Sequence, residues 1–360
     1  PQQGKVARLI CDVYKPDGTP YESDPRYILK KVMAEAKEMG YTFDVGPECE
    51  FFLFHTDEDG LPTTFSHEKA SYFDLGPLDL GENARRDIVL TLEDMGFEVE
   101  ESHHEFAPAQ HEVDFKYDEA LLTADNIMTF KLVVKTIAKR HGLHATFMPK
   151  PKFGINGSGM HLNMSISRDG INVFQDAKDE YGLSKEAYCF IGGIMKHMKA
   201  LTFITNPSIN SYKRLIPGYE APVYIAWSAK NRTPLIRIPG TRGEYTRVEL
   251  RNPDPSANPY LALEGCLAAG LDGIKEGTMP PKAVNRNVYE MTDEERKIFG
   301  IEKLPGSLIE AAKEFQKDTF IQEILGEDLS RKYIEAKASE YQDYRIQITD
   351  WELEKYLHLL

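Results

Sequence analysis

The sequence predicts a protein of the α+β class. Segments with strand character and segments with helical character are interleaved along the 360 residues, but no regular series of parallel βαβ units repeats. No internal repeat or low-complexity segment is present, and no change in composition marks a linker. We therefore expect one main domain. A chain of this length buries about 75% of its unfolded surface, which is enough for a large core.

The first half of the chain contains the clearest helix signals. Asp24 is a suitable N-cap, Pro25 fits the first helical position and Gly40 fits the C-terminal stop of a helix. The helices expected in this half cover residues 25–39, 82–95 and 121–140. The expected strands cover residues 6–13, 48–54, 97–102, 111–115, 143–148 and 160–166.

The second half becomes mostly helical after residue 259. Glycine and proline residues interrupt the region before it, which leaves room for short strands only. The expected strands cover residues 235–238 and 245–250. The expected helices cover residues 185–202, 260–275, 308–325 and 331–341.

The net charge indicates which partners the protein avoids, and the cysteine content indicates its redox environment. A net charge of −14 argues against nucleic acid and acidic membranes as partners. The four cysteines lie far apart and form no paired zinc or redox motif, which predicts a reducing, cytoplasmic environment. No apolar run is long enough to span a membrane.

Glu48 and Glu50 form the first pair of carboxylates that could take part in chemistry. Residues two apart on a strand point to the same face. Two carboxylates on one face beside Cys49 and Phe51 repel each other and lose hydration, and a bound cation relieves both effects. A solvated strand face is the alternative, and the apolar neighbours argue against it.

The segment from His103 to Glu112 holds three histidines and two glutamates. Pro108 rules out a regular helix through its middle. A strand, a tight turn and a returning strand would bring Glu105 and Glu112 together, and such oxygen ligands suit Mg²⁺ or Mn²⁺. A histidine alone is more often structural, but this density of His and Glu indicates a metal site.

A glycine-rich turn begins at Asn156 and leads to His161 at the start of a strand. Exposed amides in such a turn can hold an anionic or polar ligand, and a plain turn with a core histidine is the alternative. Neither a GxxxxGK[ST] phosphate loop nor a complete dinucleotide fingerprint is present. A nucleotide would therefore be bound by another design.

Arginines are concentrated in one region of this acidic chain. Guanidinium groups bind carboxylates and phosphates through paired hydrogen bonds, so the cluster indicates an anionic ligand. Alternation along the strand at 245–250 places Glu249 on the same face as two of the arginines. Salt bridges to the surplus acidic residues are the alternative. The arginines are Arg214, Arg232, Arg237, Arg247 and Arg251.

Together these motifs resemble the glutamine synthetase family, most closely its bacterial type I enzymes. Six segments match in the family's order and span most of the chain, which is far more specific than any single motif. They are GPECEFF from Gly46, SHHEFAPAQHEVDF from Ser102, KPKFGINGSGMHLNMS from Lys150, NSYKRLIPGYEAP from Asn210, NRTPLIRIP from Asn231 and RVELRNPDPSANPYLAL from Arg247.

The resemblance implies a curved, mainly antiparallel sheet that lines a metal-binding active-site funnel and is flanked by helices. Residues 24–360 correspond to the family's catalytic domain, and residues 1–23 to the tail of a β-rich N-terminal domain. In the family that domain completes the neighbouring subunit's site with an Asp that helps to hold ammonium. We therefore expect this chain alone to make glutamine poorly or not at all.

The resemblance also implies the ligands of the reaction. Glutamate, ATP and ammonium are the expected substrates, with two to three Mg²⁺ or Mn²⁺ ions in each site. The ligands implied for the first metal are Glu50, Glu105 and Glu112, and those implied for the second are Glu48, His161 and Glu249.

The remaining site residues are implied in the same way. Glu220 lies in the loop that closes over glutamate and takes a proton from ammonium, and Arg232 lies near the reacting carboxylate. The implied glutamate contacts are Asn156, Gly157, Arg214, Glu220, Arg232 and Arg251. The implied ATP contacts are Glu100, Asn163, Met164, Ser165, Arg232, Arg237, Glu244, Tyr245 and Thr246.

The implied reaction has two steps. The side-chain carboxylate of glutamate attacks the γ-phosphate of ATP to give γ-glutamyl phosphate, and ammonia then displaces phosphate to give glutamine. A ligase that uses a polyamine or another amine, and a non-catalytic relative kept for binding or regulation, are the alternatives. A metal-dependent kinase that acts on a guanidino compound ranks third.

Assembly and regulation are also implied by the resemblance. The family forms two stacked hexameric rings, so a homo-oligomer is expected, and a dodecamer in the full-length protein. Tyr289 lies where some type I enzymes are adenylylated, but Met291-Thr292-Asp293 replaces their Leu-Pro-Pro run, so a structural tyrosine is expected. The other type I branch is inhibited by glutamine and binds regulatory proteins, which leaves a regulatory partner open.

Overall fold

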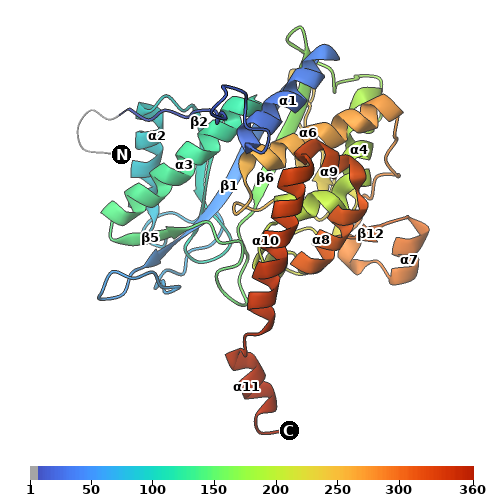
Figure 1. Ribbon diagram of the computed structural model, residues 1–360. Coiled ribbons are helices and arrows are strands. Elements are labelled where there is room, and N and C mark those ends of the chain that lie inside the picture. Colours follow the sequence, from blue (N-terminus) through green and yellow to red (C-terminus); the bar gives the residue numbers. More distant parts are fainter. Residues whose placement is uncertain (1–6) are drawn as a thin grey trace.

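A computed structural model describes residues 7–360 and places a ten-stranded sheet at the centre of the molecule (Figure 1). The strand order is β2-β3-β1-β6-β11-β10-β9, with β4 and β5 beside β1 and β7 beside β6. All of these pairs are antiparallel except β9 with β10. The α+β prediction and the mainly antiparallel sheet are confirmed.

The strands of this sheet are β1 (Thr42–His55), β2 (Val99–His104), β3 (Gln110–Phe115), β4 (Asp118–Glu119), β5 (Leu143–Thr146), β6 (Met160–Arg168), β7 (Ile171–Asn172), β9 (Trp227–Ser228), β10 (Ile236–Arg237) and β11 (Val248–Leu250). A separate antiparallel pair is formed by β8 (Tyr224–Ile225) and β12 (Glu302–Lys303).

The helices are α1 (Pro25–Glu38), α2 (Glu82–Asp94), α3 (Ala120–Arg140), α4 (Lys185–Thr205), α5 (Ser211–Arg214), α6 (Pro259–Glu276), α7 (Asp293–Ile298), α8 (Leu308–Lys317), α9 (Thr319–Leu325), α10 (Glu327–Arg345) and α11 (Asp350–Tyr356). Two short 3₁₀ helices cover Gly243–Tyr245 and Val288–Glu290. Within residues 7–360, no helix is both long enough and apolar enough to cross a bilayer.

The cap signals at the first helix are confirmed. The Asp24 side chain accepts a hydrogen bond from the main-chain N–H of Arg26, and Pro25 opens α1. Gly40 follows the helix with φ = 81°, a left-handed conformation that favours glycine.

Three sequence predictions of secondary structure are wrong. Residues 7–13 form no strand, and Val6 lies outside the described residues. The helix expected over 308–325 is divided into α8 and α9, because Asp318 leaves the helical conformation and caps α9 by accepting from Ile321 N–H. The strand expected from residue 245 begins only at Val248, since Tyr245 belongs to a 3₁₀ turn.

The long strand β1 separates the core from the polar face of the sheet. Its odd-numbered residues, among them Val45, Cys49 and Phe51, are buried in the main hydrophobic core. That core also receives apolar residues from α1, α3, α4 and α6, so these helices pack on the same side. Its even-numbered residues Glu48 and Glu50 project from the opposite face. The predicted alternation in β1 is confirmed.

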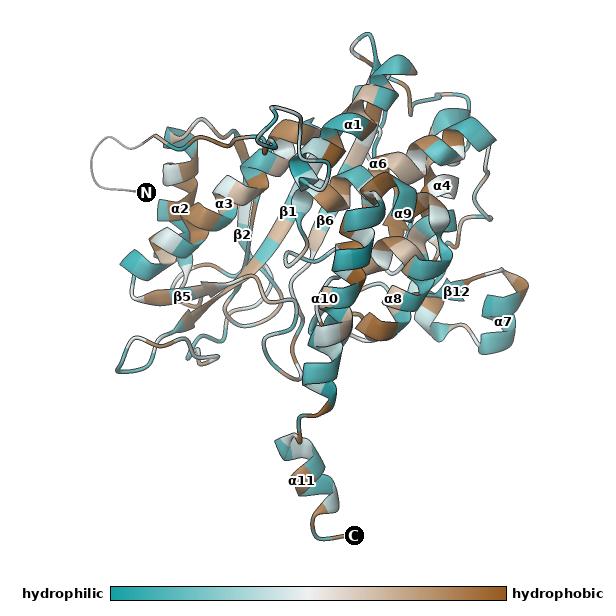
Figure 2. Cartoon of the chain, in the orientation of Figure 1, coloured by the Kyte–Doolittle hydropathy of each residue, from teal (hydrophilic) through white to brown (hydrophobic). Residues whose placement is uncertain are grey.

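Helices α4 and α6 approach each other closely through glycine. A β-carbon on Gly193 would overlap the carbonyl oxygen of Ala269, and one on Gly273 would overlap the carbonyl oxygen of Cys189. Fourteen of the 18 residues of α6 are buried, whereas only Ser330 is buried among the 19 of α10. Figure 2 agrees, because α10 is hydrophilic over much of its length.

Glu264 is a carboxylate inside this helix pair. Its side chain is fully buried on α6, and neither of its oxygens has a hydrogen-bond partner among the described residues. Burial raises the pKa of Glu264 well above its usual value of 4.5. Burial in the folded protein therefore favours the neutral form of this group.

Replacing Glu264 with leucine is expected to stabilise the fold by about 1–3 kcal/mol at neutral pH, since an unpaired polar group is removed from the core. In the unfolded chain Glu264 ionises once the pH exceeds its usual pKa, whereas in the folded chain its ionisation requires a higher pH. The free energy of unfolding is therefore not reduced by Glu264 at low pH, and it falls as the pH rises from the usual pKa toward the pKa in the folded protein. Urea unfolding should show a gain that grows from about pH 5 to pH 8. An equal gain at both pH values, or the same gain from the exposed Glu335→Leu, would contradict this account.

Candidate active site

A polar cavity of about 200 Å³ opens on the face of the sheet opposite the helices. All six carboxylate and histidine positions singled out as metal ligands line it, and so do the six positions expected to contact glutamate. These residues come from β1, the β2–β3 hairpin, β6, β11 and the loops around residues 156, 220 and 232. The sheet therefore gathers residues as far apart in the chain as Glu48 and Arg251.

The first group in the cavity contains Glu48, His161 and Glu249. Glu48 and His161 are direct partners across the β1–β6 pair, which places His161 Nδ1 2.9 Å from a Glu48 oxygen. Glu249 reaches the same imidazole from β11, with 3.8 Å between Glu249 Oε1 and His161 Nδ1. One ligand atom from each of the three residues lies within 4.8 Å of the others, which is close enough for a shared cation.

The second group contains Glu105, Glu112 and His103. The β2–β3 hairpin aligns His103 with Glu112, and His103 Nε2 lies 3.0 Å from Glu105 and 3.4 Å from Glu112. Glu50 stands opposite Glu112 across the β1–β3 pair. The strand, turn and returning strand predicted from Pro108 are confirmed, and they bring Glu105 and Glu112 together.

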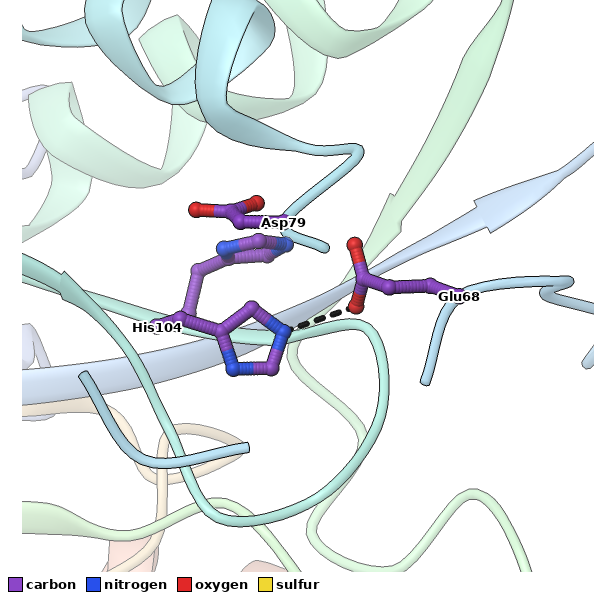
Figure 3. Close-up of side chains that lie close together, drawn as sticks. Glu68, Asp79 and His104 are labelled. Atoms are coloured by element: carbon purple, nitrogen blue, oxygen red, sulfur yellow. Dashed lines mark hydrogen bonds and ion pairs between the residues drawn. The ribbon is translucent and has the colours of Figure 1, made fainter. Parts of the chain in front are cut away.

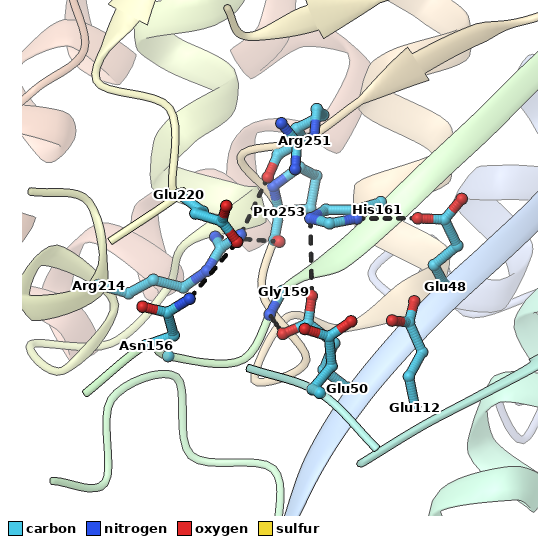
Figure 4. Close-up of polar contacts among 12 residues, drawn as sticks. Glu48, Glu50, Glu112, Asn156, Gly159, His161, Arg214, Glu220, Arg251 and Pro253 are labelled. Atoms are coloured by element: carbon cyan, nitrogen blue, oxygen red, sulfur yellow. Dashed lines mark hydrogen bonds and ion pairs between the residues drawn. The ribbon is translucent and has the colours of Figure 1, made fainter. Parts of the chain in front are cut away.

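His161 also connects the two groups. Figure 4 shows its ring between Glu48 and Glu50, and 3.8 Å separates His161 Nε2 from Glu50 Oε1. Glu50 Oε2 accepts hydrogen bonds from Gln110 Nε2 at 2.7 Å and from Gly159 N–H at 3.0 Å. A β-carbon on Gly159 would lie 2.6 Å from Arg214 Nη2 and 2.8 Å from His161 Nε2, so this turn requires glycine.

The carboxylates in the cavity differ in their affinity for protons. Burial and the nearby Glu105 raise the pKa of Glu50 to about 7. Burial and the charges of Glu50, Glu48 and Glu105 raise the pKa of Glu112 well above its usual value. Burial also opposes ionisation of Glu48, but the hydrogen bond and charge of His161 lower its pKa to about 2. Crowded carboxylates of this kind gain stability from a cation.

The donors present fit divalent cations. Glu249 is 1% exposed, and its Oε2 atom makes no hydrogen bond within the described structure. Arg237 and Arg251 lie within ion-pair distance of Glu249, but their Nε groups do not form hydrogen bonds to it. The oxygen-rich set with one imidazole in each group is the chemistry that Mg²⁺ and Mn²⁺ select.

The arginines form another wall of the cavity, next to Glu249. Arg214 is buried, and its guanidinium donates to the carbonyl oxygens of Asn252 at 2.7 Å and Arg251 at 3.0 Å. Arg251 donates in turn to the carbonyl oxygen of Arg232. The main chain therefore fixes these side chains in place before any anion binds.

Glu220 lies at the edge of this wall in a left-handed conformation, with φ = 58°. Asn156 Nδ2 is 3.5 Å from one of its oxygens, and Figure 4 shows the two side chains facing each other near Arg214. Burial raises the pKa of Glu220. The loop thus presents a carboxylate that accepts protons more readily than an exposed one.

Seven positions expected to contact ATP do not line the cavity. Asn163 contacts a residue that lines the cavity, because its Nδ2 donates to Glu48 Oε1 at 2.8 Å. Its neighbour Met164 has its side chain in the hydrophobic core, so it offers no side-chain contact to a nucleotide. The positions outside the cavity lining are Glu100, Asn163, Met164, Ser165, Glu244, Tyr245 and Thr246. Of the positions expected to contact ATP, only Arg232 and Arg237 line it.

Several of these outer positions lie close together along β6 and β7. Asn172 donates to the carbonyl oxygens of Glu244 at 2.9 Å and Thr246 at 2.8 Å. Ser165 is on the same face of β6 as Asn163, two residues further along the strand. Glu100 is exposed and sits at the irregularity in the β2–β3 pairing.

Several lining residues were missed in the sequence. Gln110 and Asp114 alternate with Glu112 on β3, so the period of two could have found them. Glu101 and His103 alternate on β2 in the same way. Tyr72 comes from the irregular segment between β1 and α2, where no periodicity predicts which side chain faces the site.

Comparison with known proteins agrees with these features. The family described as "Glutamine synthetase, catalytic domain" matches residues 22–356. A glutamine synthetase from Clostridium saccharobutylicum is 63% identical over 358 residues, which cover 99% of this chain and 81% of the relative.

Two solved structures extend the comparison. One, titled as a GmaS/ADP complex, superposes with a TM-score of 0.87 at 36% identity over 96% of this chain and 80% of the other. The cryo-EM structure of Plasmodium falciparum glutamine synthetase has a TM-score of 0.84 at 29% identity, over 96% of this chain and 81% of the other. The cavity, its ligand groups and these matches together establish that the chain belongs to the glutamine synthetase family.

Proposed function

We propose that this chain catalyses the ATP-dependent ligation of ammonia to the side-chain carboxylate of L-glutamate, giving L-glutamine, ADP and phosphate through γ-glutamyl phosphate. The observation that carries the proposal is the single cavity in which two carboxylate–histidine groups face a wall of arginines. This arrangement suits the transfer of a phosphoryl group to a carboxylate, in which anionic reactants must be brought together.

Two sets of residues would hold the divalent ions. Glu48, His161 and Glu249 would bind one ion, and Glu50, Glu105 and Glu112 another, with His103 beside the second set. We propose two to three Mg²⁺ or Mn²⁺ ions in each site. Bound there, the ions neutralise phosphate charge during transfer.

The arginine wall would bind the substrates. Arg214 and Arg251, with Asn156 and the main chain of Gly157, would hold glutamate, and Arg232 and Arg237 would face the phosphates. A β-carbon on Gly157 would overlap the carbonyl oxygen of Pro149, so only glycine fits at this close approach.

The nucleotide would extend from the cavity along β6 and β7. Asn163 connects this row of residues to Glu48, and Asn172 ties residues 244 and 246 to it. The similarity to a protein solved as an ADP complex supports nucleotide binding by this chain. The proposed contacts are Glu100, Asn163, the main chain of Met164, Ser165, Arg232, Arg237, Glu244, Tyr245 and Thr246.

Glu220 would act in the second step. Ammonia forms a bond to the activated carbonyl carbon, phosphate leaves, and a proton from ammonium passes to the Glu220 carboxylate. The raised pKa of Glu220 favours this transfer. Closure of its loop would keep water from hydrolysing the activated intermediate.

Tyr289 holds the loop that carries Glu220. It is half-buried, and its hydroxyl donates to the carbonyl oxygen of Ala221, as expected for a structural tyrosine. Tyr289→Phe is expected to weaken glutamate binding about fivefold, because one hydrogen bond of about 1 kcal/mol is lost from the loop. Steady-state kinetics should show a higher KM for glutamate, with the exposed Tyr344→Phe as the control. An unchanged KM would contradict this role.

Assembly, location and domain limits are proposed from the family. We propose a cytoplasmic homo-oligomer, a dodecamer in the full-length protein, with residues 24–360 as its catalytic unit and a regulatory protein among its partners. Residues 346–360 support assembly, since they extend away from the body of the chain with Ile348, Trp351 and Leu357 exposed. Native mass spectrometry measures the number of subunits directly.

The proposed reaction has a direct test. Phosphate release and glutamine formation are measured with ATP, glutamate, ammonium and Mg²⁺ or Mn²⁺, and each component is omitted in turn. We expect equal amounts of phosphate and glutamine, and no product without metal. Faster product formation with methylamine or a polyamine than with ammonium would assign a different acceptor. Failure to bind Mn²⁺ or ATP would contradict an enzymatic role altogether.

A further inference from the structure

A second polar cluster lies beneath the cavity, outside the residues that would contact substrate. It contains Glu68, Asp79, Arg85, His104 and His111, and all five side chains are buried. Figure 3 shows His104 facing Glu68, with Asp79 nearby. These residues come from the segment between β1 and α2, from α2 itself and from the β2–β3 hairpin.

The geometry of this cluster argues against a further metal site. Its carboxylates and imidazoles lie within 4.8 Å of one another, but Arg85 Nη1 lies 2.6 Å from Asp79 Oδ2 and 2.9 Å from His111 Nδ1. The carboxylate of Glu68 is also fully engaged by hydrogen bonds. Asp79 is thus paired with Arg85, and both oxygens of Glu68 already accept hydrogen bonds, so neither carboxylate is free to bind a metal.

The carboxylate of Glu68 joins three separate segments. Its Oε1 accepts from His104 Nε2 at 2.7 Å and from the main-chain N–H of Ala109 at 2.5 Å. Its Oε2 accepts from the main-chain N–H groups of Leu80 at 2.9 Å and Gly81 at 3.2 Å. The segment before α2 is therefore tied to both ends of the β2–β3 turn.

The turn fixed in this way carries the metal-ligand candidate Glu105. The other ring nitrogen of His104 lies 2.6 Å from the carbonyl oxygen of Glu105, and Glu105 N–H donates to Gln110 O at 2.8 Å. Each nitrogen of His104 therefore lies within hydrogen-bond distance of an oxygen atom. Glu68 thus acts on Glu105 through a single intervening side chain.

The same segment carries Tyr72 to the cavity and Phe73 to His103 beside it. Phe73 N–H donates to the carbonyl oxygen of His104 at 3.0 Å, and the Phe73 ring stacks on His103 with 4.5 Å between ring centroids. Tyr72 lines the cavity beside Glu105. A loss of the Glu68 contacts would therefore release both the turn and this segment.

We propose that Glu68 is a positioning residue that holds the Glu105 turn and the Tyr72 segment in register, and thereby sets the affinity of the cavity for divalent cations. The inference rests on the proposed function, because it assigns a role to Glu105 as a metal ligand. Groups that orient metal ligands typically contribute about 10- to 100-fold to metal affinity.

The test compares Glu68→Gln with Glu58→Gln, which alters an exposed residue in the same segment. The amide keeps the size of the side chain but turns an N–H₂ group toward donors. Mn²⁺ binding is measured by calorimetry and by the electron paramagnetic resonance signal of free Mn²⁺, and thermal unfolding is followed in parallel. We expect Glu68→Gln to weaken Mn²⁺ binding about 10- to 100-fold with the fold retained, and Glu58→Gln to match the unaltered protein.

Two outcomes would overturn the inference. A Glu68→Gln protein with a lower Tm but unchanged Mn²⁺ affinity would show that Glu68 acts on stability alone. A Glu68→Gln protein with unchanged Tm and unchanged Mn²⁺ affinity would show that Glu68 has neither role. If Glu68→Gln does not fold, His104→Gln replaces it, because its amide can still donate to Glu68 while the contact with Glu105 is lost. Unchanged Mn²⁺ affinity in that variant would also overturn the inference.

The proposed function can fail separately. Unaltered protein that binds Mn²⁺ but releases no phosphate from ATP in the presence of glutamate and ammonium would contradict the reaction, while the Mn²⁺ affinities of the variants would still decide the role of Glu68.

Discussion

Replacing Glu249 with glutamine is expected to lower kcat at least 100-fold, with glutamine and phosphate formation falling together. Glu249 is the one carboxylate of β11 in the cavity, and it faces His161, Arg237 and Arg251 at once. Removal of its charge leaves these groups without their shared anion and removes a proposed ligand of the ion that Glu48 and His161 would also bind. Loss of one preorganised charge in an active site typically costs about 10²–10³ in kcat.

The measurement combines steady-state kinetics with thermal unfolding. Glutamine has nearly the volume of glutamate, so the circular dichroism spectrum should match that of the unaltered protein. Glu335→Gln, on the exposed face of α10, is the control and should keep full activity. Arg232→Ala tests the arginine wall, and we expect it also to abolish phosphoryl transfer. Full turnover by either variant would refute the site assignment.

Replacing Gly193 with alanine is expected to destabilise the fold by about 3 kcal/mol, the upper end of the range for overpacking in a core. The added β-carbon would overlap Ala269 O and lie 2.7 Å from Gly273 N. Both are main-chain atoms of α6, so relief requires the two helices to move apart. The higher helix propensity of alanine stabilises the fold by about 1 kcal/mol, which is less than the destabilisation from overpacking.

Gly265→Ala is a matched control for this prediction. It also adds a methyl group inside α6, but the new atom would meet only Leu201 Cδ2, at 2.8 Å, and that side chain can turn away. Urea unfolding should give a much lower midpoint for Gly193→Ala than for Gly265→Ala. Equal midpoints would mean that the α4–α6 approach is not limited by its glycines.

The sequence was sufficient to predict the positions of site residues that lie on regular secondary structure. Glu48 and Glu50 could be placed on one face because a strand has a period of two, and Pro108 identified the turn between Glu105 and Glu112. The pairing of β1 with β6, which brings His161 to Glu48, depends on residues more than 100 positions apart. The order of the strands is not encoded in local patterns.

The segment between β1 and α2 shows what local patterns miss. Glu68 and Tyr72 lie in irregular structure, where side-chain direction follows from tertiary contacts alone. The same limit applies to Glu264, because a helix pattern does not reveal that every face of α6 is covered. It also applies to residues 7–13, where an apolar run finds no neighbouring strand.

Strand β1 supplies residues to the core on one face of the sheet and to the cavity on the other, which restricts where the chain can gain or lose residues. An insertion or deletion of one residue between Gly46 and Phe54 would turn Cys49 and Phe51 toward the cavity and move two carboxylates into the core. Within this strand, inherited variation is therefore confined to substitutions. The exposed turn at residues 57–60 has no such restriction, so differences in length among relatives are expected there and not nine residues earlier.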